Sequence, residues 1–309
     1  MSVVAQGIYP PAAGSTGTSA IHKDSSVFMD WASACSVQRG LQDIAKLNAD
    51  TTSVGGPANV IGKADGISVV SLGDGGEAIV QFNGSIFDGQ GPDFAIFENA
   101  FNPTFLELAF VEVSSDGVNF YRFPAHSLTD TSTAVGSFGE VEASNVNNLA
   151  GKYQANYGTP FDLNELKGIS GLDIQKVTHI KIIDVVGSLQ TGFATRDTAG
   201  NKINDQYPTA FPSGGFDLEA IGAIYMNPLG IDSRQQKAVK LYPNPASSQV
   251  TLDEKWRGAS YEICNLQGKQ VGSGKLTETS ILVEPLTKGL YFLRVELYGE
   301  VRTAKLIKE

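Results

Sequence analysis

Short apolar runs, rich in Val, Ile and Phe, recur along the chain between segments rich in glycine and proline. Runs of this length between turn-forming residues are typical of β-strands. Helix signals are weak: the pattern allows two turns at 41–47, and Asp162 is placed to cap one turn through Leu166. In the first 230 residues the pattern predicts strands at 67–72, 77–82, 93–98, 108–114, 119–123, 177–184 and 218–225.

Two segments between these strands lack a regular pattern. Residues 84–93 are too rich in glycine for a strand or a helix, and residues 125–160 contain many Ser, Thr, Asn and Gly. Long loops inside a compact domain usually carry function or are disordered. The pattern as a whole predicts an all-β protein.

The charge balance changes at a polar segment with turn formers, residues 228–239. Residues 240–309 hold ten basic and eight acidic residues, a net charge of +2, so 13 basic and 25 acidic residues leave −12 for residues 1–239. We therefore expect a domain at 1–230, a linker at 231–239 and a domain at 240–309. Short runs in the second domain predict a small Ig-like, seven-stranded β-sandwich, at 239–242, 249–252, 260–264, 269–271, 280–283, 290–297 and 301–307.

Four motifs follow one another in the second domain: LYPNPA at 241–246, ICNLQGK at 263–269, LTKGLYFLR at 286–294 and KLIK at 305–308. Together they resemble the type A sorting domain of the type IX secretion system of Bacteroidetes. The resemblance implies export through the periplasm, contact with the type IX machinery, and release or retention at the outer-membrane surface. The alternative is a generic sandwich without a sorting role. The sorting-signal residues that the resemblance implies are Pro243, Asn244, Pro245, Gly268, Lys288, Gly289, Tyr291 and Lys305.

Four motifs also mark the first domain: VSLGDGG at 70–76, DGQGPDFAIFEN at 88–99, VEVSSDGVNF at 111–120 and GGFDLEAI at 214–221. Through them the domain is similar to a loosely defined group of bacterial cell-surface proteins of unassigned activity. The third motif also resembles a strand-turn-strand of discoidin-like carbohydrate-binding jelly rolls. The resemblance implies a jelly-roll-like β-sandwich for the first domain and a location at the cell surface.

Composition excludes some partners and locations. The 23 basic and 33 acidic residues give a net charge of −10, which would repel a phosphate backbone, so nucleic acid is not an expected partner. No stretch approaches the ~20 apolar residues of a membrane-spanning helix. The two cysteines, Cys35 and Cys264, lie in different predicted domains without zinc or redox spacing, so we expect free buried thiols.

Acidic residues gather in the loops of the first domain, with 17 Asp or Glu against seven Lys or Arg between residues 88 and 219. Crowded carboxylates repel one another unless a cation lies among them, and a set of hard oxygen ligands favours calcium. The alternative is an acidic face in contact with solvent. The predicted calcium ligands are Asp88, Asp93, Glu98, Asp184, Asp205 and Asp217.

Aromatic residues lie in or beside the same loops. Tyr153, Tyr157, Tyr207 and Phe211 have hydrogen-bonding neighbours that suit a sugar or another flat ligand, so we predict ligand contacts there. The alternative for each ring is packing in the sandwich core.

Catalytic motifs are few. The chain has three histidines and lacks a nucleophile elbow, a zinc-protease motif and a phosphate loop. Glu98 and Asp217 could cleave a glycoside if the fold placed them about 5–9 Å apart. We expect a secreted binding protein for carbohydrate or another small ligand, with calcium ordering its acidic loops; the alternatives are a glycoside hydrolase and a structural surface adhesin.

Overall fold

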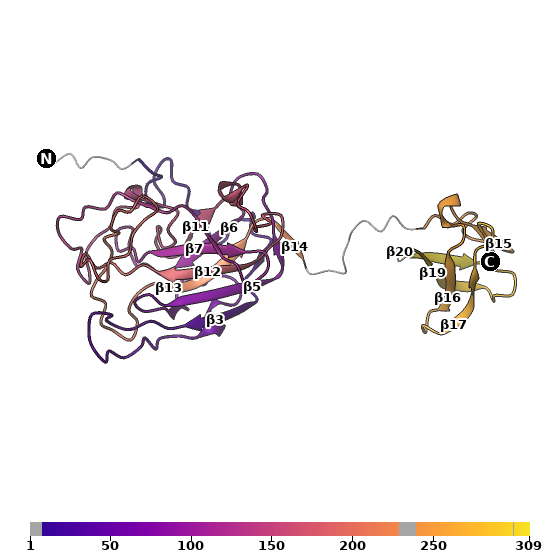
Figure 1. Cartoon of the computed structure of the whole chain (residues 1–309), viewed down its shortest axis with the longest axis horizontal. Coiled ribbons are helices and arrows are strands. Elements are labelled where there is room, and N and C mark those ends of the chain that lie inside the picture. The colour runs from indigo at the N-terminus through magenta and orange to yellow at the C-terminus, as the bar shows by residue number, and fades with distance from the viewer. Residues whose placement is uncertain (1–7, 229–238, 299) are drawn as a thin grey trace. The chain divides into compact units, whose positions relative to one another are not determined.

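The computed structural model describes residues 8–228, 239–298 and 300–309. The chain forms two compact units, Met1–Gly230 and Ile231–Glu309 (Figure 1). The linker predicted at 231–239 lies outside the described residues except for Val239. In the described residues the only helical segments are short 3-10 turns, so the all-β fold class is confirmed.

The N-terminal unit is a sandwich of two antiparallel sheets, each with six strands among the described residues. The first sheet has the order β1-β11-β6-β13-β2, with β4 also paired to β13. Its strands are β1 (Ile21–His22), β11 (Tyr157–Phe161), β6 (Phe94–Glu98), β13 (Asp217–Ala223), β2 (Asp30–Trp31) and β4 (Val70–Ser71). The second has the order β14-β5-β12-β7-β8, with β3 also paired to β5. Its strands are β14 (Met226–Pro228), β5 (Glu77–Ile86), β12 (Val177–Asp184), β7 (Ala109–Ser114), β8 (Tyr121–Arg122) and β3 (Ala34–Gln38).

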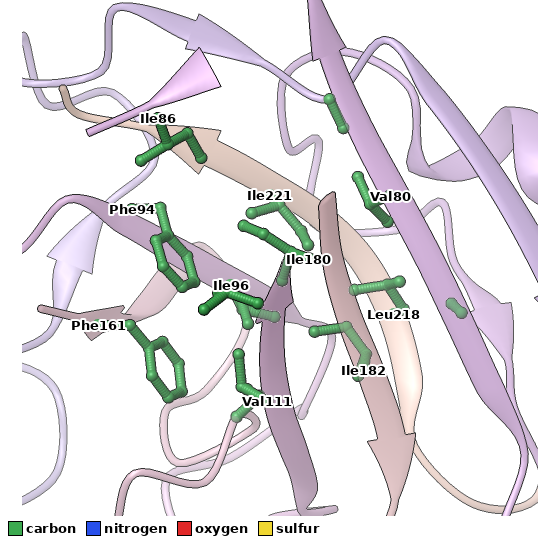
Figure 2. Close-up of a cluster of buried hydrophobic side chains, with 14 of the residues drawn as sticks. Val80, Ile86, Phe94, Ile96, Val111, Phe161, Ile180, Ile182, Leu218 and Ile221 are labelled. Atoms are coloured by element: carbon green, nitrogen blue, oxygen red, sulfur yellow. The ribbon is translucent and has the colours of Figure 1, made fainter. Parts of the chain in front are cut away.

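The main core lies between the two sheets. Buried residues alternate with more exposed ones along β5 and β12, so one face of each strand supplies the core. Burial of each large apolar side chain stabilises the fold by roughly 1.5–3 kcal/mol. Figure 2 shows core side chains from both sheets reaching toward one another, among them Val80, Ile86, Val111, Ile180 and Ile182 from the second sheet and Phe94, Ile96, Phe161, Leu218 and Ile221 from the first.

The first sheet is also covered on its outer face. Ala95 and Phe97 of β6 belong to a second apolar cluster, against which Phe28 and Trp31 pack. The ring of Phe97 lies 5.3 Å from that of Trp31, centroid to centroid. Because both faces of β6 are covered, all five of its residues are buried, including the terminal Glu98.

Each strand predicted for this unit overlaps a strand of the structure, but β4 and β8 are only two residues long. The turn capped by Asp162 is confirmed: its carboxylate accepts a hydrogen bond from the backbone N–H of Asn164 at 2.9 Å, at the start of the 3-10 helix Leu163–Leu166. No helix forms at 41–47, where Leu41 instead makes isolated β-bridges to Thr51 and Asp74. The remaining short elements are β9 (His126–Ser127), β10 (Val146–Asn147) and the 3-10 helices Pro57–Val60 and Ala143–Asn145.

The C-terminal unit has a four-stranded sheet, β17-β16-β19-β20, and a two-stranded sheet, β15-β18, around its own apolar core. Its described residues form six strands rather than seven, because 239–242 contributes only an isolated bridge from Tyr242 to Thr251. The strands are β15 (Gln249–Thr251), β16 (Ser260–Asn265), β17 (Gln270–Lys275), β18 (Ser280–Leu282), β19 (Gly289–Leu297) and β20 (Glu300–Lys308), with a 3-10 helix at Glu254–Trp256.

Candidate functional site

A pocket opens where β6 ends and β13 begins. The two strands are antiparallel neighbours in which Glu98 pairs with Leu218, so Glu98 and Asp217 meet at one end of the sheet. The pocket has a volume of about 290 Å³ and is lined by three acidic residues, Glu98, Glu107 and Asp217. We call it the acidic pocket.

Glu98 and Asp217 are held inside the protein by backbone and hydroxyl groups. Glu98 is 1% exposed, and one of its carboxylate oxygens accepts a hydrogen bond from the backbone N–H of Ala100 at 2.9 Å. Asp217 is 9% exposed and accepts a hydrogen bond from the hydroxyl of Ser71. Burial, and then the charge of Asp217, raise the pKa of Glu98 well above its ordinary value. Burial also raises the pKa of Asp217 to about 6.

Glu107 is the third carboxyl of the pocket, and it was not among the predicted site residues. It lies in the segment before β7 and is partly exposed. Burial, followed by the charges of Glu98 and Asp217, raises its pKa well above the ordinary value. Its side chain makes no hydrogen bond or ion pair with the residues that the structure describes. Glu107 is therefore available to a ligand.

A row of four phenylalanine rings borders the acidic pocket: Phe101, Phe105, Phe138 and Phe211. Successive ring centroids along this Phe row are 4.5, 6.4 and 5.7 Å apart. Phe101 and Phe138 are 74% and 73% exposed. A contiguous exposed aromatic surface of this kind marks an interaction site more often than a scattered single ring does. The pocket thus combines carboxyl groups with an apolar rim.

The six predicted metal ligands are divided among separate places. Asp93 and Glu98 flank opposite ends of β6, and five residues of extended chain span roughly 16 Å, so one ion cannot contact both. Asp88 and Asp93 lie at the first end of the strand, while Glu98 and Asp217 lie at the other. A single cation among Asp88, Asp93, Glu98, Asp205 and Asp217 is excluded by this geometry.

Asp184 and Asp205 instead hold the backbone. The carboxylate of Asp184 accepts hydrogen bonds from the N–H groups of Gly75 and Phe216 at 2.9 and 2.7 Å. That of Asp205 accepts from Leu108 and from Gln206, both at 2.8 Å. Burial raises the pKa of Asp205 to about 7 and that of Asp184 well above its ordinary value. Each of these carboxylates thus fixes the position of two backbone N–H groups.

Asp88 and Asp93 come together with Asp162, which the sequence indicated only as a helix cap. One ligand oxygen from each lies within 4.8 Å of the other two, which makes this the one group of three acidic side chains among the described residues that could hold a metal ion. Asp93 is fully buried and accepts from the N–H groups of Gly89 and Leu163, both at 2.7 Å. Oδ1 of Asp88 is buried without a hydrogen-bond partner. We call this group the Asp triad.

Of the aromatic residues predicted to contact a ligand, only Phe211 lines the acidic pocket. Tyr153 is 1% exposed within an apolar cluster, and its hydroxyl pairs with that of Ser19 at 2.8 Å, so its ring is a core residue. Tyr157 is half-buried and packs edge-on against His22. Tyr207 donates a hydrogen bond to Asp43 at 3.0 Å.

The residues missed in the pocket are Glu107, Phe101, Phe105 and Phe138. One signal was available for Glu107: a carboxylate between Leu106 and Leu108 breaks an apolar run. Phe101 and Phe105 lie four residues apart in the loop between β6 and β7, but Phe138 lies in the loop between β9 and β10, so no local pattern identifies the three rings as one surface.

In the C-terminal unit, the first and last sorting motifs are joined by hydrogen bonds. Asn244 donates from its side-chain amide to the carbonyl of Lys305 at 2.7 Å and accepts from the N–H of Ile307 at 2.9 Å. Ala246 continues the contact by bridging Lys308 in parallel. Cis peptide bonds precede Pro243 and Pro245. The segment therefore covers the edge of β20, which would otherwise present unpaired backbone groups.

The other predicted sorting residues occupy a turn, exposed positions and, for Tyr291, a buried position in β19. Gly268 has a φ of +75° in the turn between β16 and β17, a conformation that favours glycine. Tyr291 is buried, and its hydroxyl donates to the carbonyl of Thr287 at 2.8 Å. Lys288, Gly289 and Lys305 are exposed.

Comparison with protein-family models matches residues 240–309 to a family described as the secretion system C-terminal sorting domain. The match covers the segment in which the four motifs occur, so the predicted resemblance is confirmed for this unit. Among the described residues, no helix is long and apolar enough to cross a membrane. A comparison with curated proteins found no match.

Solved structures with some likeness include PorZ of Porphyromonas gingivalis, described as an essential surface component of its type IX secretion system. That alignment has 13% identity and a TM-score of 0.22 over 78% of this chain and 38% of PorZ. A β-glucuronidase from Ruminococcus gnavus aligns at 10% identity and a TM-score of 0.21, over 92% of this chain and 45% of that enzyme. β-Glucuronidase 3 of Bacteroides uniformis aligns at 11% identity and a TM-score of 0.21, over 93% of this chain and 35% of that enzyme. The chain spans less than half the length of each, and similarity at this level carries no argument about its function.

Proposed function

Because residues 240–309 are a secretion system C-terminal sorting domain, this is a secreted or cell-surface protein of the type IX route, and we propose that its N-terminal unit binds a small ligand there. The observation that supports the proposal most directly is the acidic pocket with its Phe row. Aromatic rings pack against the apolar face of a sugar, and carboxylates accept hydrogen bonds from its hydroxyls. A carbohydrate is thus one ligand class that suits the pocket.

We also propose that calcium binds the Asp triad and orders the loop between β5 and β6. The support is the convergence of three carboxylates, together with the buried, unpartnered Oδ1 of Asp88. Calcium takes six to eight oxygen ligands, so backbone carbonyls of the glycine-rich loop would complete the set. An ion at this place offsets the mutual repulsion of the carboxylates.

Thermal melting tests the calcium proposal. A ligand that binds the folded protein alone, at 100 times its Kd, stabilises it by about 2.7 kcal/mol, which corresponds to roughly 5–10 °C for a domain of this size. Chelated protein should therefore melt higher when millimolar calcium is restored. The Asp88→Asn variant should lose this shift, while Asp50→Asn, at an exposed position outside the triad, should keep it. An unchanged melting temperature of the unmodified chain contradicts calcium binding.

A glycan array tests the ligand proposal. The full chain should retain particular glycans, and Phe138→Ala, which removes an exposed ring of the Phe row, should abolish retention without loss of folding. Phe292→Ala, which removes an exposed ring of the C-terminal unit, is the matched control. Should no glycan or other small ligand be retained, a structural adhesin becomes the better account.

A second function, glycoside cleavage, is favoured by one observation: Glu98 and Asp217 share the pocket, and each has a raised pKa. Glycosidases use two carboxyl groups about the scissile bond, one of them protonated as a general acid. The test is the release of reducing sugar from a retained glycan. A hydrolase should lose turnover in Glu98→Gln while still binding, whereas a binding protein releases no sugar in either form.

A further inference from the structure

The ionisable groups of the acidic pocket define the chemical class of the ligand more narrowly than the shape of the pocket does. We propose that the ligand carries an organic cation, an ammonium or guanidinium group, which lies among Glu98, Glu107 and Asp217 while its apolar part packs on the Phe row. This inference rests on the proposed binding function and names the chemical class of the ligand.

The ionisable groups in the lining of the pocket are all acidic. The lining contains three carboxyl groups and no lysine, arginine or histidine. Asp184, Asp205 and Glu219 lie further off and add to the repulsion at Glu107 or Glu98. A neutral ligand would leave this repulsion in place, whereas a positive group relieves it and lets the carboxyls ionise.

The spacing of the carboxyls favours an organic cation over a metal ion. Glu98, Glu107 and Asp217 are not among the described acidic groups whose ligand oxygens lie within 4.8 Å of one another. A metal ion needs its ligands that close, because metal–oxygen distances are short. A guanidinium group, or an ammonium on a short stem, reaches carboxylates that are farther apart, and each N–H can donate to a different oxygen.

The Phe row supplies independent support. Its exposed rings line the same pocket as the three carboxyl groups, and an aromatic face attracts a cation within about 6 Å of its centroid. Four successive rings also offer an apolar surface for the stem or ring that carries the cation. A volume of about 290 Å³ accommodates a small group rather than a folded partner.

Pairs of related ligands, each with one cationic and one neutral member, provide the test, with the full chain in an isothermal titration. The pairs are N-acetylarginine amide with N-acetylcitrulline amide, for a side chain on a peptide, and glucosamine with N-acetylglucosamine, for an amino sugar. We expect the charged member of at least one pair to bind tenfold or more tightly than its neutral partner, and the pair that responds identifies the source of the cation.

Variants place the binding in the pocket. Glu107→Gln removes one charge without breaking a hydrogen bond of the described structure, so it should fold normally and weaken the charged ligand about tenfold. Asp50→Asn, an equal charge loss at an exposed position elsewhere, should change nothing. If the neutral members bind as tightly as the charged ones, the cation inference is overturned while the binding function stands. If neither pair binds but a neutral glycan is retained on the array, the cation inference is again overturned and the binding function stands. If nothing binds in either experiment, the cation inference and the proposed binding function both fail.

Discussion

Substitution of Asp217 by asparagine should make the protein more stable at neutral and alkaline pH. In the folded protein, burial raises the pKa of Asp217 from 3.8 to about 6. A carboxyl whose folded pKa exceeds its unfolded value stabilises the fold fully below the unfolded pKa, and this contribution is lost as the pH rises through the folded pKa. For Asp217 the loss falls between about pH 4 and pH 6.

The magnitude follows from the size of that shift. A change of about two pKa units, at 1.36 kcal/mol for each unit, corresponds to about 3 kcal/mol of folding free energy. Asparagine cannot ionise, and its amide oxygen can still accept the hydrogen bond from Ser71. Because Glu98 repels the same charge, the measured gain will depend on both residues. We expect Asp217→Asn to exceed the unmodified protein by about 1–3 kcal/mol at pH 8.

Denaturant titrations at pH 4, 5, 6, 7 and 8 provide the measurement, with calcium and candidate ligands absent. The difference in unfolding free energy between variant and unmodified protein should be small at pH 4, grow through pH 6 and level off above it. Asp50→Asn serves as the control for the loss of one surface charge. Two results would refute the account of Asp217 as a buried charge that lowers stability: a variant less stable than the unmodified protein at pH 8, or a gain in unfolding free energy at pH 4 as large as that at pH 8.

Three further predictions concern other parts of the chain. Asn244→Ala should destabilise the C-terminal unit by about 1–3 kcal/mol and speed amide exchange at Ile307, because two hydrogen bonds to β20 are lost; retention of exchange protection at Ile307 would contradict this. Gly151→Ala should lower the free energy of unfolding by more than about 2 kcal/mol in a thermal melt, because its φ is +78° and an added Cβ would also collide with backbone atoms. Gly168→Ala should lower it less, because its φ is similar, at +86°, but the space around the added Cβ is open. Burial raises the pKa of the Cys35 thiol from 9.0 to about 11. In a variant that lacks the other cysteine, Cys35 should therefore react with a thiol reagent at pH 8 about 100-fold more slowly in the folded protein than in the unfolded protein. Equal rates in the two states would disprove the protection of this thiol.

The local pattern of apolar residues predicted the strands in which buried residues alternate with polar ones or form a continuous run. The alternation of Ile180 and Ile182 with polar neighbours identifies β12, and the apolar run at 94–97 identifies β6. Strand β11 was missed because it contains Gly158 and Pro160, which argue locally against a strand. Its pairing with β6 comes from tertiary contact. The predicted helical turns at 41–47 failed for a related reason: Leu41 forms bridges to Thr51 and Asp74, and one turn hydrogen bond, from the N–H of Lys46 to the carbonyl of Asp43, forms within the segment.

The candidate sites were predicted in part. The acidic character of the loops was evident in the sequence, and Asp88 and Asp93 do lie together because they share one short loop. The third member of each group was missed. Asp162 reaches the Asp triad from the segment after β11, and Glu107 reaches the acidic pocket from the segment before β7. Neither approach is visible until the strands are assembled.

By itself, the sequence determined the β class, the division of charge and the sorting domain, because alternation, composition and contiguous motifs are properties of neighbouring residues. Only the tertiary structure decided which carboxylates meet. The length of β6 separates Asp93 from Glu98, and the antiparallel pairing of β6 with β13 brings Glu98 to Asp217. Burial, and after it electrostatic repulsion, depend on distances in space, so the raised pKa values, and the ligand that would relieve the repulsion, follow from strand pairing rather than from the order of residues.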